Sequence, residues 1–336
     1  MRIATITAAL ALAAASSPLL AQSWQPPTPE QRCPSKWGAG DERGAANYMS
    51  PANVLRASRL IKTGEVVELG RVLESSMPLF GTRRFEIHTK RTGPALGSNK
   101  RRSNEEIVIT ELGQVGTQFD MFSHQTIGNQ FYNCFDNDEI ATRGGFTKLG
   151  VEKIGMLFTR GVLIDVAALK GVTMLPAGYE ITAADLRGAL QRQGVSLQPG
   201  DAALIHSGYG KLWNVDNVTY NKDTPGIGVA AAEWLAGQQV MLIGADTYGV
   251  EVAPNPDKNL SLPVHQIALA VNGIFLLENL NLNELAASGA SEFAFMVQPL
   301  KIKGATGSTV APVAVRLPEC ITAARSSPPP DSGPIA

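Results

Sequence analysis

The sequence predicts a single compact α/β domain with a mixed, partly parallel sheet. Short apolar runs, typical of buried strands, alternate along the chain with segments whose apolar residues recur at helical spacing. Between residues 37 and 323 there is no linker, repeat or block of like charge, which favours one domain. The length of 336 residues and the hydrophobic content of 44% are sufficient for a well-buried core.

Six apolar runs are predicted to form buried strands. They are short and rich in valine, isoleucine and leucine. Helical segments separate some of them, and a strand–helix–strand connection makes at least part of the sheet parallel. The six runs are Val66–Leu69, Ile107–Leu112, Gly161–Val166, Ala202–His206, Val240–Ile243 and Gly273–Leu277.

Four segments are predicted to be helical. Pro51–Lys62 has Ser50 as its N-cap and Gly64 as its stop. The segment Thr182–Gln193 begins at the capping residue Thr182 and ends at Gly194. The two other candidates are Ile227–Leu235 and Val264–Val271.

The first residues have the features of a secretory signal peptide. Arg2 supplies a positive start, Ile3–Ala15 forms an apolar core, and Ala21 is a small residue at the expected cleavage point. A retained membrane anchor is the alternative, but spanning a bilayer needs about 20 apolar residues. We therefore expect residues 1–21 to be removed and the protein to be periplasmic or secreted, with no membrane span after cleavage.

The composition of the rest of the chain limits the classes of partner. Residues 22–36 are predicted to be an extended lead-in, and the proline- and serine-rich residues 324–336 a disordered tail. Over the full sequence, lysine and arginine number 29 against 30 aspartates and glutamates, for a net charge of -1. A general nucleic-acid binder is therefore excluded, because such a protein carries a basic surface.

The chain has three cysteines, Cys33, Cys134 and Cys320. An exported protein can keep disulfides. A bridge between Cys33 and Cys320 would tie both ends to the core and leave Cys134 free. This pairing is a hypothesis, because an odd number of cysteines fixes only that at least one is unpaired within the chain.

Histidine is scarce, and the common catalytic motifs are absent. The sequence contains no G-x-S-x-G, H-E-x-x-H or Walker A pattern. The four histidines are His88, His124, His206 and His265, so any histidine chemistry must use this set. His206 ends a predicted strand, where it either contacts substrate or is a hydrogen-bonded structural residue.

The strongest local pattern is Gln114-Val-Gly-Thr-Gln118-Phe-Asp120-Met-Phe-Ser-His124. Its four polar side chains are separated by even numbers of residues, so an extended chain places them on one face. A straight strand would separate Gln114 from His124 by about 33 Å. A single site therefore requires a bend, for which Gly116-Thr117 is suitable. The alternative is a polar turn beside a sheet.

Two further groups of residues lie downstream. Glu278 ends a predicted buried strand after His265, and a carboxylate there needs a cation or another partner. Asp246 and Glu251 follow the run Val240–Ile243, and ligands of α/β proteins bind at the carboxyl ends of parallel strands. For each group the alternative is a helix cap or a surface salt bridge.

Together these residues resemble the cyclase-like metal hydrolase family that includes bacterial kynurenine formamidase and isatin hydrolase. The family motif H-x-G-T-H-x-D-x-P-x-H aligns without gaps with Q-V-G-T-Q-F-D-M-F-S-H, which starts at Gln114. His265 and Glu278 occupy the positions of the downstream histidine and glutamate. The similarity runs from about Val66 to about Leu300.

The resemblance implies a swivelling β/β/α fold, usually homo-oligomeric, with one or two divalent metal ions and a small-molecule substrate. His124 would be the catalytic acid/base. Phe80 lies in the segment that supplies an aromatic residue to the substrate pocket, and Asp246 and His206 are further candidates for substrate binding. By position, the metal ligands would be Gln114, Gln118, Asp120, His265 and Glu278, with His265 serving the second ion.

The sequence departs from the family pattern at three positions. Glutamine replaces both histidine ligands of the motif, at Gln114 and Gln118, and Phe122 replaces the proline. Glutamine binds metals only through its neutral amide oxygen, a hard donor. Two such oxygens with two carboxylates suit Mn²⁺, Mg²⁺ or Ca²⁺ better than Zn²⁺, and we favour Mn²⁺ in a weaker site.

The predicted function is that of an exported metal-dependent hydrolase that cleaves an amide, cyclic amide or lactone bond with a metal-activated water. His124 would move the proton between water and leaving group, because the ordinary pKa of histidine lies near neutrality. One alternative is a metal-assisted cyclase or isomerase without net hydrolysis. The other is a non-catalytic exported binding protein whose site has lost its metal.

Overall fold

A nine-stranded mixed sheet forms the centre of the structure, a computed structural model that describes residues 23–316. Its strands lie in the order β1-β15-β13-β7-β9-β11-β12-β4-β14, and the pairs β2–β3, β5–β6 and β8–β10 form small separate sheets. The strands are β1 (Val66–Glu68), β2 (Phe85–Arg91), β3 (Asn104–Thr110), β4 (Gln118–Asp120), β5 (Ala141–Thr142), β6 (Gly145–Phe146), β7 (Leu157–Asp165), β8 (Glu180–Ile181), β9 (Ala202–His206), β10 (Gly226–Ile227), β11 (Leu242–Ala245), β12 (Phe275–Glu278), β13 (Glu292–Val297), β14 (Gly307–Thr309) and β15 (Val313–Arg316).

The middle of the sheet is parallel. Strands β7, β9, β11 and β12 run side by side in the same direction, and Gly244 of β11 pairs with Leu204 on one side and Leu277 on the other. β9, β11 and β12 are buried along their whole length, as expected for parallel strands covered on both faces. Antiparallel strands complete the sheet at both flanks. The predicted α/β fold with a mixed, partly parallel sheet is confirmed.

Helices connect the strands and cover the sheet. The side chain of Ser50 caps α2, and Thr182 forms a capping box at the start of α5, which ends at Gly194 with a left-handed φ of 70°. α2 ends at Ser58, short of the predicted Lys62. The helices are α1 (Pro29–Arg32), α2 (Pro51–Ser58), α3 (Asn137–Ile140), α4 (Val166–Lys170), α5 (Ala183–Gln193), α6 (Asn217–Tyr220), α7 (Val229–Gly237), α8 (Pro263–His265) and α9 (Asn283–Ala287), with the 3₁₀ helices η1 (Gly44–Tyr48), η2 (Tyr132–Cys134), η3 (Val151–Lys153) and η4 (Tyr209–Leu212) and the π-helix η5 (Gln266–Asn272).

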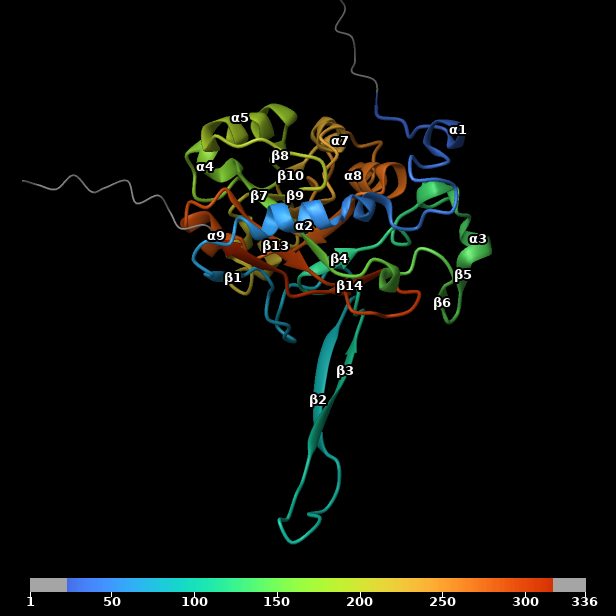
Figure 1. Ribbon diagram of the computed structural model, residues 1–336, viewed down its shortest axis with the longest axis vertical. Coiled ribbons are helices and arrows are strands. Elements are labelled where there is room, and N and C mark those ends of the chain that lie inside the picture. Colours follow the sequence, from blue (N-terminus) through green and yellow to red (C-terminus); the bar gives the residue numbers. More distant parts are fainter. Residues whose placement is uncertain (1–22, 317–336) are drawn as a thin grey trace, which may run out of the picture.

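A long hairpin projects from the body of the protein. Helices α4, α5, α7 and α8 lie on one side, and the hairpin β2–β3 extends from the opposite side (Figure 1). The two strands pair over their whole length, but Ile87, Ile107 and Val108 are 53%, 48% and 44% exposed. The prediction that Ile107–Leu112 is a buried strand was therefore wrong. An apolar β-branched run predicts a strand, but it does not show what covers the strand.

A disulfide joins Cys33 to Cys134, with their Cα atoms 6.0 Å apart. The predicted pairing of Cys33 with Cys320 was wrong, and Cys320 lies outside the described residues. Contacts beside the bridge explain the pairing that forms. The amide of Ser35 donates to Oδ1 of Asn133 over 2.8 Å, so the chain after Cys33 already lies against the turn that contains Cys134.

The segment before the domain is not wholly extended. Within the predicted lead-in of residues 22–36, helix α1 forms one short turn with Pro29 at its start and a capping box from Thr28. The predicted signal peptide, residues 1–21, and the predicted tail, residues 324–336, lie outside the described residues. Among residues 23–316, no helix combines the length and apolar character needed to cross a membrane.

Candidate metal centre

Strands β4 and β12 bring distant site residues into contact. They pair antiparallel with Gln118 opposite Glu278 and Asp120 opposite Leu276. Residues directly opposite each other place their side chains on the same face of a sheet. Nε2 of Gln118 accordingly donates to Oε2 of Glu278 over 3.0 Å, although the two residues are 160 positions apart in sequence.

Three phenylalanines form a rigid layer behind these strands. Phe119 and Phe122 both pack on Phe275 with ring centroids 4.8 and 4.7 Å apart, and all three rings are fully buried. Phe122 stands at the position of the motif proline and stacks on Phe275 with only 13° between the ring planes. The departure from the motif at this position therefore fills the core.

The chain bends before β4, as the sequence predicted. Gly116 has a left-handed φ of 64°, and a Cβ at this position would lie 2.1 Å from Cδ2 of Leu73. Glycine is therefore required both by the backbone conformation and by the close approach of Leu73. Because of the bend, Nε2 of Gln114 lies 3.5 Å from Oδ1 of Asp120.

The two glutamines present their amide nitrogens to the carboxylates. Gln114 donates to Asp120, Gln118 donates to Glu278, and Nη2 of Arg83 donates to Oε1 of Gln114 over 3.2 Å. In this arrangement both glutamines act as hydrogen-bond donors. Because the oxygen and nitrogen of an amide exchange places by a half-turn of its terminal torsion, each side chain can also present its oxygen.

Glu251 holds His265 in position. The backbone amides of Val264 and His265 donate to the carboxylate of Glu251 over 3.1 and 3.0 Å, and Nδ1 of His265 lies 2.5 Å from Oε1 of Glu251. Nε2 of the same ring therefore faces the centre, 3.3 Å from Oε1 of Glu278 and 3.7 Å from Oδ2 of Asp120. Residue 251 was noted in the sequence only as an acidic residue after a strand, and its contact with His265 was not predicted.

His124 completes the cluster. Its ring centroid lies 6.1 Å from that of His265, and potential ligand atoms of Asp120, His124 and His265 all lie within 4.8 Å of one another. The sequence placed His124 at the site as an acid/base. The structure puts it close enough to Asp120 and His265 to share a metal ion with them as well.

The charges of the cluster are strongly coupled. Burial and the neighbouring Glu278 raise the pKa of Asp120 well above its ordinary value. Burial alone would lower the pKa of His265, but its hydrogen bonds with Glu251 and Glu278 raise that pKa well above the ordinary value. Burial, reinforced by the charge of His265, lowers the pKa of His124 to about 4. His124 is therefore neutral at neutral pH and can accept a proton or donate a lone pair.

The donor set fits a divalent cation. Oδ2 of Asp120 is buried and has no hydrogen-bond partner among the described residues, and the carboxylate of Glu278 is buried beside it. Two adjacent buried carboxylates require compensating positive charge. Carboxylate oxygens, the imidazole nitrogens of His265 and His124, and the nearby amides are all common ligands of divalent metals.

Phe80 lies at the edge of the same centre. Its ring stacks on Tyr248 with centroids 4.9 Å apart and is 45% exposed. Together with Gln114 and Gln118 it lines a small pocket. The structure therefore brings the predicted aromatic residue next to the predicted glutamine ligands.

The side chains of Asp246 and His206 make their hydrogen bonds with residues outside the metal cluster. Oδ1 of Asp246 accepts hydrogen bonds from the amide and the hydroxyl of Ser207 over 2.9 and 2.6 Å, and Nδ1 of His206 lies 2.9 Å from Asp165. Neither Asp246 nor His206 lines the pocket beside Phe80. A role for either residue in substrate binding stays a prediction.

Asn279 connects the two halves of the centre, which are the end of β12 and the bend before β4. Sequence reasoning did not assign this role to it. It follows Glu278, is buried, and has a left-handed φ of 58°. Its Nδ2 donates to the carbonyl of Gly116 over 2.8 Å, and its own carbonyl accepts from Thr117 Oγ1 over 2.9 Å. Its Oδ1 accepts from the hydroxyl of Tyr220 over 2.8 Å. The only signal in the sequence was a polar residue directly after the predicted ligand.

A buried cluster of carboxylates and histidines beside a mixed α/β sheet is an arrangement common in enzymes. Residues 67–252 match the family described as "Putative cyclase". A crystal structure described as a novel cyclase is 34% identical, with a TM-score of 0.75 over 84% of this chain and 98% of the other. The chain belongs to this cyclase family, which confirms the resemblance inferred from the motif.

More distant structures share the fold. An isatin hydrolase bound to the product analogue thioisatinate is 23% identical, with a TM-score of 0.54 over 79% of this chain and 98% of the other. Isatin hydrolase A from Ralstonia solanacearum is 22% identical, with a TM-score of 0.51 over 78% and 94% of the two chains. No curated protein sequence matches.

Proposed function

We propose that the protein is an exported metal-dependent hydrolase that opens an amide, cyclic amide or lactone bond in a small molecule. The observation that carries this proposal is the buried cluster of Asp120, His265 and Glu278 with the neutral His124 beside it. Membership of the cyclase family supports an enzyme. The fold shared with isatin hydrolases supports a hydrolase-type reaction on a small ring compound.

Asp120, Glu278 and His265 would hold the cation, and Gln114 and Gln118 would add their amide oxygens after a half-turn of each amide. When bound, the ion supplies Lewis-acid activation of a carbonyl group and of water. We propose Mn²⁺ in preference to Zn²⁺, Mg²⁺ or Ca²⁺, as one or two ions, because carboxylate and amide oxygens are hard donors while His265 adds one nitrogen.

The remaining roles fall to side chains around the cluster. His124, neutral at neutral pH, takes a proton from the attacking water and returns it to the leaving nitrogen or oxygen. Phe80 and Tyr248, stacked 4.9 Å apart, offer a flat surface on which a substrate ring can pack. Arg83 holds Gln114 at the rim of the pocket.

Location and assembly are part of the proposal. Export to the periplasm or beyond is supported by the disulfide between Cys33 and Cys134, because such bridges persist mainly in oxidising compartments. A homo-oligomer is supported by the exposed apolar side chains on the β2–β3 hairpin, among them Ile87, Ile107 and Val108.

The test combines elemental analysis with product mass. Protein purified without chelator is expected to hold a near-stoichiometric divalent metal and to add one water to an amide, cyclic amide or lactone from a screen that includes isatin. An isomeric product without added water would instead establish the cyclase or isomerase alternative. A protein that stays metal-free after incubation with Mn²⁺ and Zn²⁺ would establish the binding-protein alternative.

A matched variant separates the last alternative from the hydrolase. The double substitution Gln114→His and Gln118→His restores the histidines of the family motif. If the natural glutamines have emptied the centre, this variant gains metal binding that the parent lacks. If the parent already binds metal, the binding-protein alternative is excluded.

A further inference from the structure

Arg83 contacts one of the two glutamines of the candidate metal centre. Its Nη2 donates to Oε1 of Gln114 over 3.2 Å, and it is the only charged residue among the described residues that line the pocket beside Phe80. The side chain is half-buried, with Cζ 5.8 Å from the ring centroid of Phe80. Arg83 forms no salt bridge within the described part of the chain, so no carboxylate draws its guanidinium away from Gln114.

The neighbours of Gln114 determine which end of its amide faces the metal cluster. A guanidinium can only donate hydrogen bonds, so Arg83 requires the amide oxygen. Nε2 of Gln118, also a donor, lies 3.5 Å from the same oxygen. At the other end, Nε2 of Gln114 lies 3.5 Å from Oδ1 of Asp120, and an ionised carboxylate only accepts. All three contacts place the nitrogen of Gln114, and not its oxygen, toward Asp120.

The half-turn that would bring this oxygen to a metal ion is therefore opposed. After the half-turn, the amide nitrogen of Gln114 would face Nη2 of Arg83 and Nε2 of Gln118, so that donors face donors. The hydrogen bond lost to Arg83 is charge-assisted, which is the stronger class of hydrogen bond. The metal ion and Arg83 thus require the same oxygen on opposite sides of Gln114.

The charge of Arg83 acts in the same direction. Burial and Glu278 raise the pKa of Asp120, and Arg83 lies close enough to oppose that rise. A fixed cation at this position partly compensates the charge of the carboxylate and repels a second cation.

We propose that Arg83 competes with the metal ion for Oε1 of Gln114 and thereby lowers the metal affinity of the centre. The inference rests on the proposed metal-dependent function. It makes Arg83 a positioning residue that acts through Gln114 and sets how readily this glutamine becomes a ligand.

The test is calorimetric titration of the mature protein with Mn²⁺, after bound metal has been removed with a chelator. Arg83→Met removes the donor and the charge. It is expected to increase the affinity for Mn²⁺ about tenfold or more, as for the release of a charge-assisted hydrogen bond. Arg83→Lys keeps a charge and a donor and should bind Mn²⁺ like the parent. An affinity of Arg83→Met equal to or below that of the parent would overturn the proposal.

A second pair of variants separates the amide from the charge. Gln114→Ala lacks the oxygen for which Arg83 competes. Adding Arg83→Met to this variant should therefore change the Mn²⁺ affinity only a few-fold, through the lost repulsion alone. The same gain with and without Gln114 would show that Arg83 acts only through its charge and would refute the competition.

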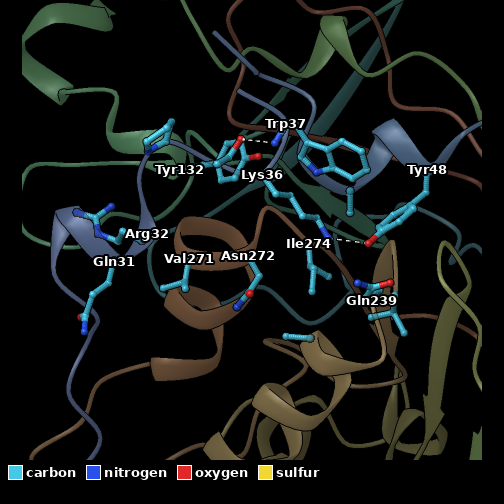
Figure 2. A pocket seen from close by; sticks show the side chains of 15 residues that line it. Gln31, Arg32, Lys36, Trp37, Tyr48, Tyr132, Gln239, Val271, Asn272 and Ile274 are labelled. Carbon is cyan, nitrogen blue, oxygen red and sulfur yellow. Dashed lines mark hydrogen bonds between the residues drawn. The ribbon is translucent and has the colours of Figure 1, made fainter. Parts of the chain in front are cut away.

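Lys36→Met is the matched control. Lys36 is also a cation that donates to a neutral side chain, with its ammonium 2.6 Å from the hydroxyl of Tyr48 (Figure 2). It lines a separate cavity of about 250 Å³, and none of the residues around that cavity lines the pocket beside Phe80. The Mn²⁺ affinity of Lys36→Met should equal that of the parent. A gain as large as that of Arg83→Met would contradict a specific role for Arg83.

The outcomes separate this inference from the proposed function. Equal Mn²⁺ binding by the parent and Arg83→Met refutes the competition and leaves the metal-dependent hydrolase intact. Binding that appears only in Arg83→Met supports the competition, but it shows that the natural centre is empty and refutes a metal-dependent reaction. Failure of both proteins to bind Mn²⁺ refutes both.

Discussion

Glu251 and His265 form the closest contact of the candidate metal centre, with Oε1 of Glu251 2.5 Å from Nδ1 of His265. The same carboxylate also accepts hydrogen bonds from the backbone amides of Val264 and His265, so it fixes the start of α8 as well as the His265 ring. A carboxylate on one ring nitrogen leaves the other nitrogen free for the metal and increases its basicity.

Substitution of Glu251 by glutamine is expected to weaken metal binding. The neutral amide keeps a hydrogen bond to His265 but removes the charge that orients the ring. Loss of such a partner typically lowers metal affinity by about 10- to 100-fold. Calorimetric titration with Mn²⁺ measures the change. The exposed Glu284→Gln variant should bind like the parent, and equal affinity in both variants would contradict the role of Glu251.

Substitution of His124 by alanine separates its two possible roles. If His124 moves the proton, turnover should fall by about 10²- to 10⁴-fold while the metal content stays unchanged. If His124 is a ligand, the metal content falls together with turnover. His88→Ala, on the exposed hairpin, is the control. Full activity of the alanine variant at position 124 would exclude both roles.

Asn279→Ala is expected to lower the free energy of unfolding by about 2–4 kcal/mol. The substitution removes the donor to Gly116 and the acceptor for Tyr220, and it places alanine at a left-handed φ of 58°. Urea denaturation followed by circular dichroism measures the loss. Asn259→Ala, at an exposed position, should change stability by less than about 0.5 kcal/mol. A similar small change at position 279 would show that Asn279 does not join the two halves.

Asp201 is expected to make stability depend on pH. Burial raises its pKa to about 6, although it pairs with Arg56 and Arg160 over 3.2 and 3.6 Å. The folded protein therefore holds this proton more tightly than the unfolded chain. The resulting stabilisation is complete below about pH 4 and is lost as the pH rises through about 6.

Asp201→Asn removes this titration. Between about pH 4 and pH 7, the natural protein should therefore lose roughly 2–3 kcal/mol of unfolding free energy relative to the asparagine variant. Urea denaturation at several pH values gives the difference directly. A difference that stays constant across this range would show that Asp201 has the same pKa in the folded and unfolded states.

The features that the sequence predicted well are local ones. Strand β9 has the predicted bounds, Ala202–His206, and the caps at Ser50 and Thr182 form as expected. The bend at Gly116 followed from a length argument, because a straight strand would place Gln114 about 33 Å from His124, too far apart for one site. Each of these predictions depends on only a few neighbouring residues.

The features that were missed depend on contacts between distant segments. The contact of Glu251 with His265 depends on the path of the intervening loop, which no periodicity describes. Three cysteines allow several pairings, so the bridge of Cys33 to Cys134 could not be chosen from the sequence. The run that forms β3 reads as a strand, but its exposure depends on its having β2 as its partner in a projecting hairpin.

The disulfide encloses part of the candidate metal centre in a covalent ring. Cys33 and Cys134 enclose a ring spanning 101 positions, and this ring contains Gln114, Gln118, Asp120 and His124. His265 and Glu278 lie on the open part of the chain. Closing a loop of this size stabilises a fold by about 4–5 kcal/mol in the chain-entropy description, because it restricts the unfolded ensemble. Four of these six residues thus belong to a macrocycle, and the other two come from the linear part of the polypeptide that packs against it.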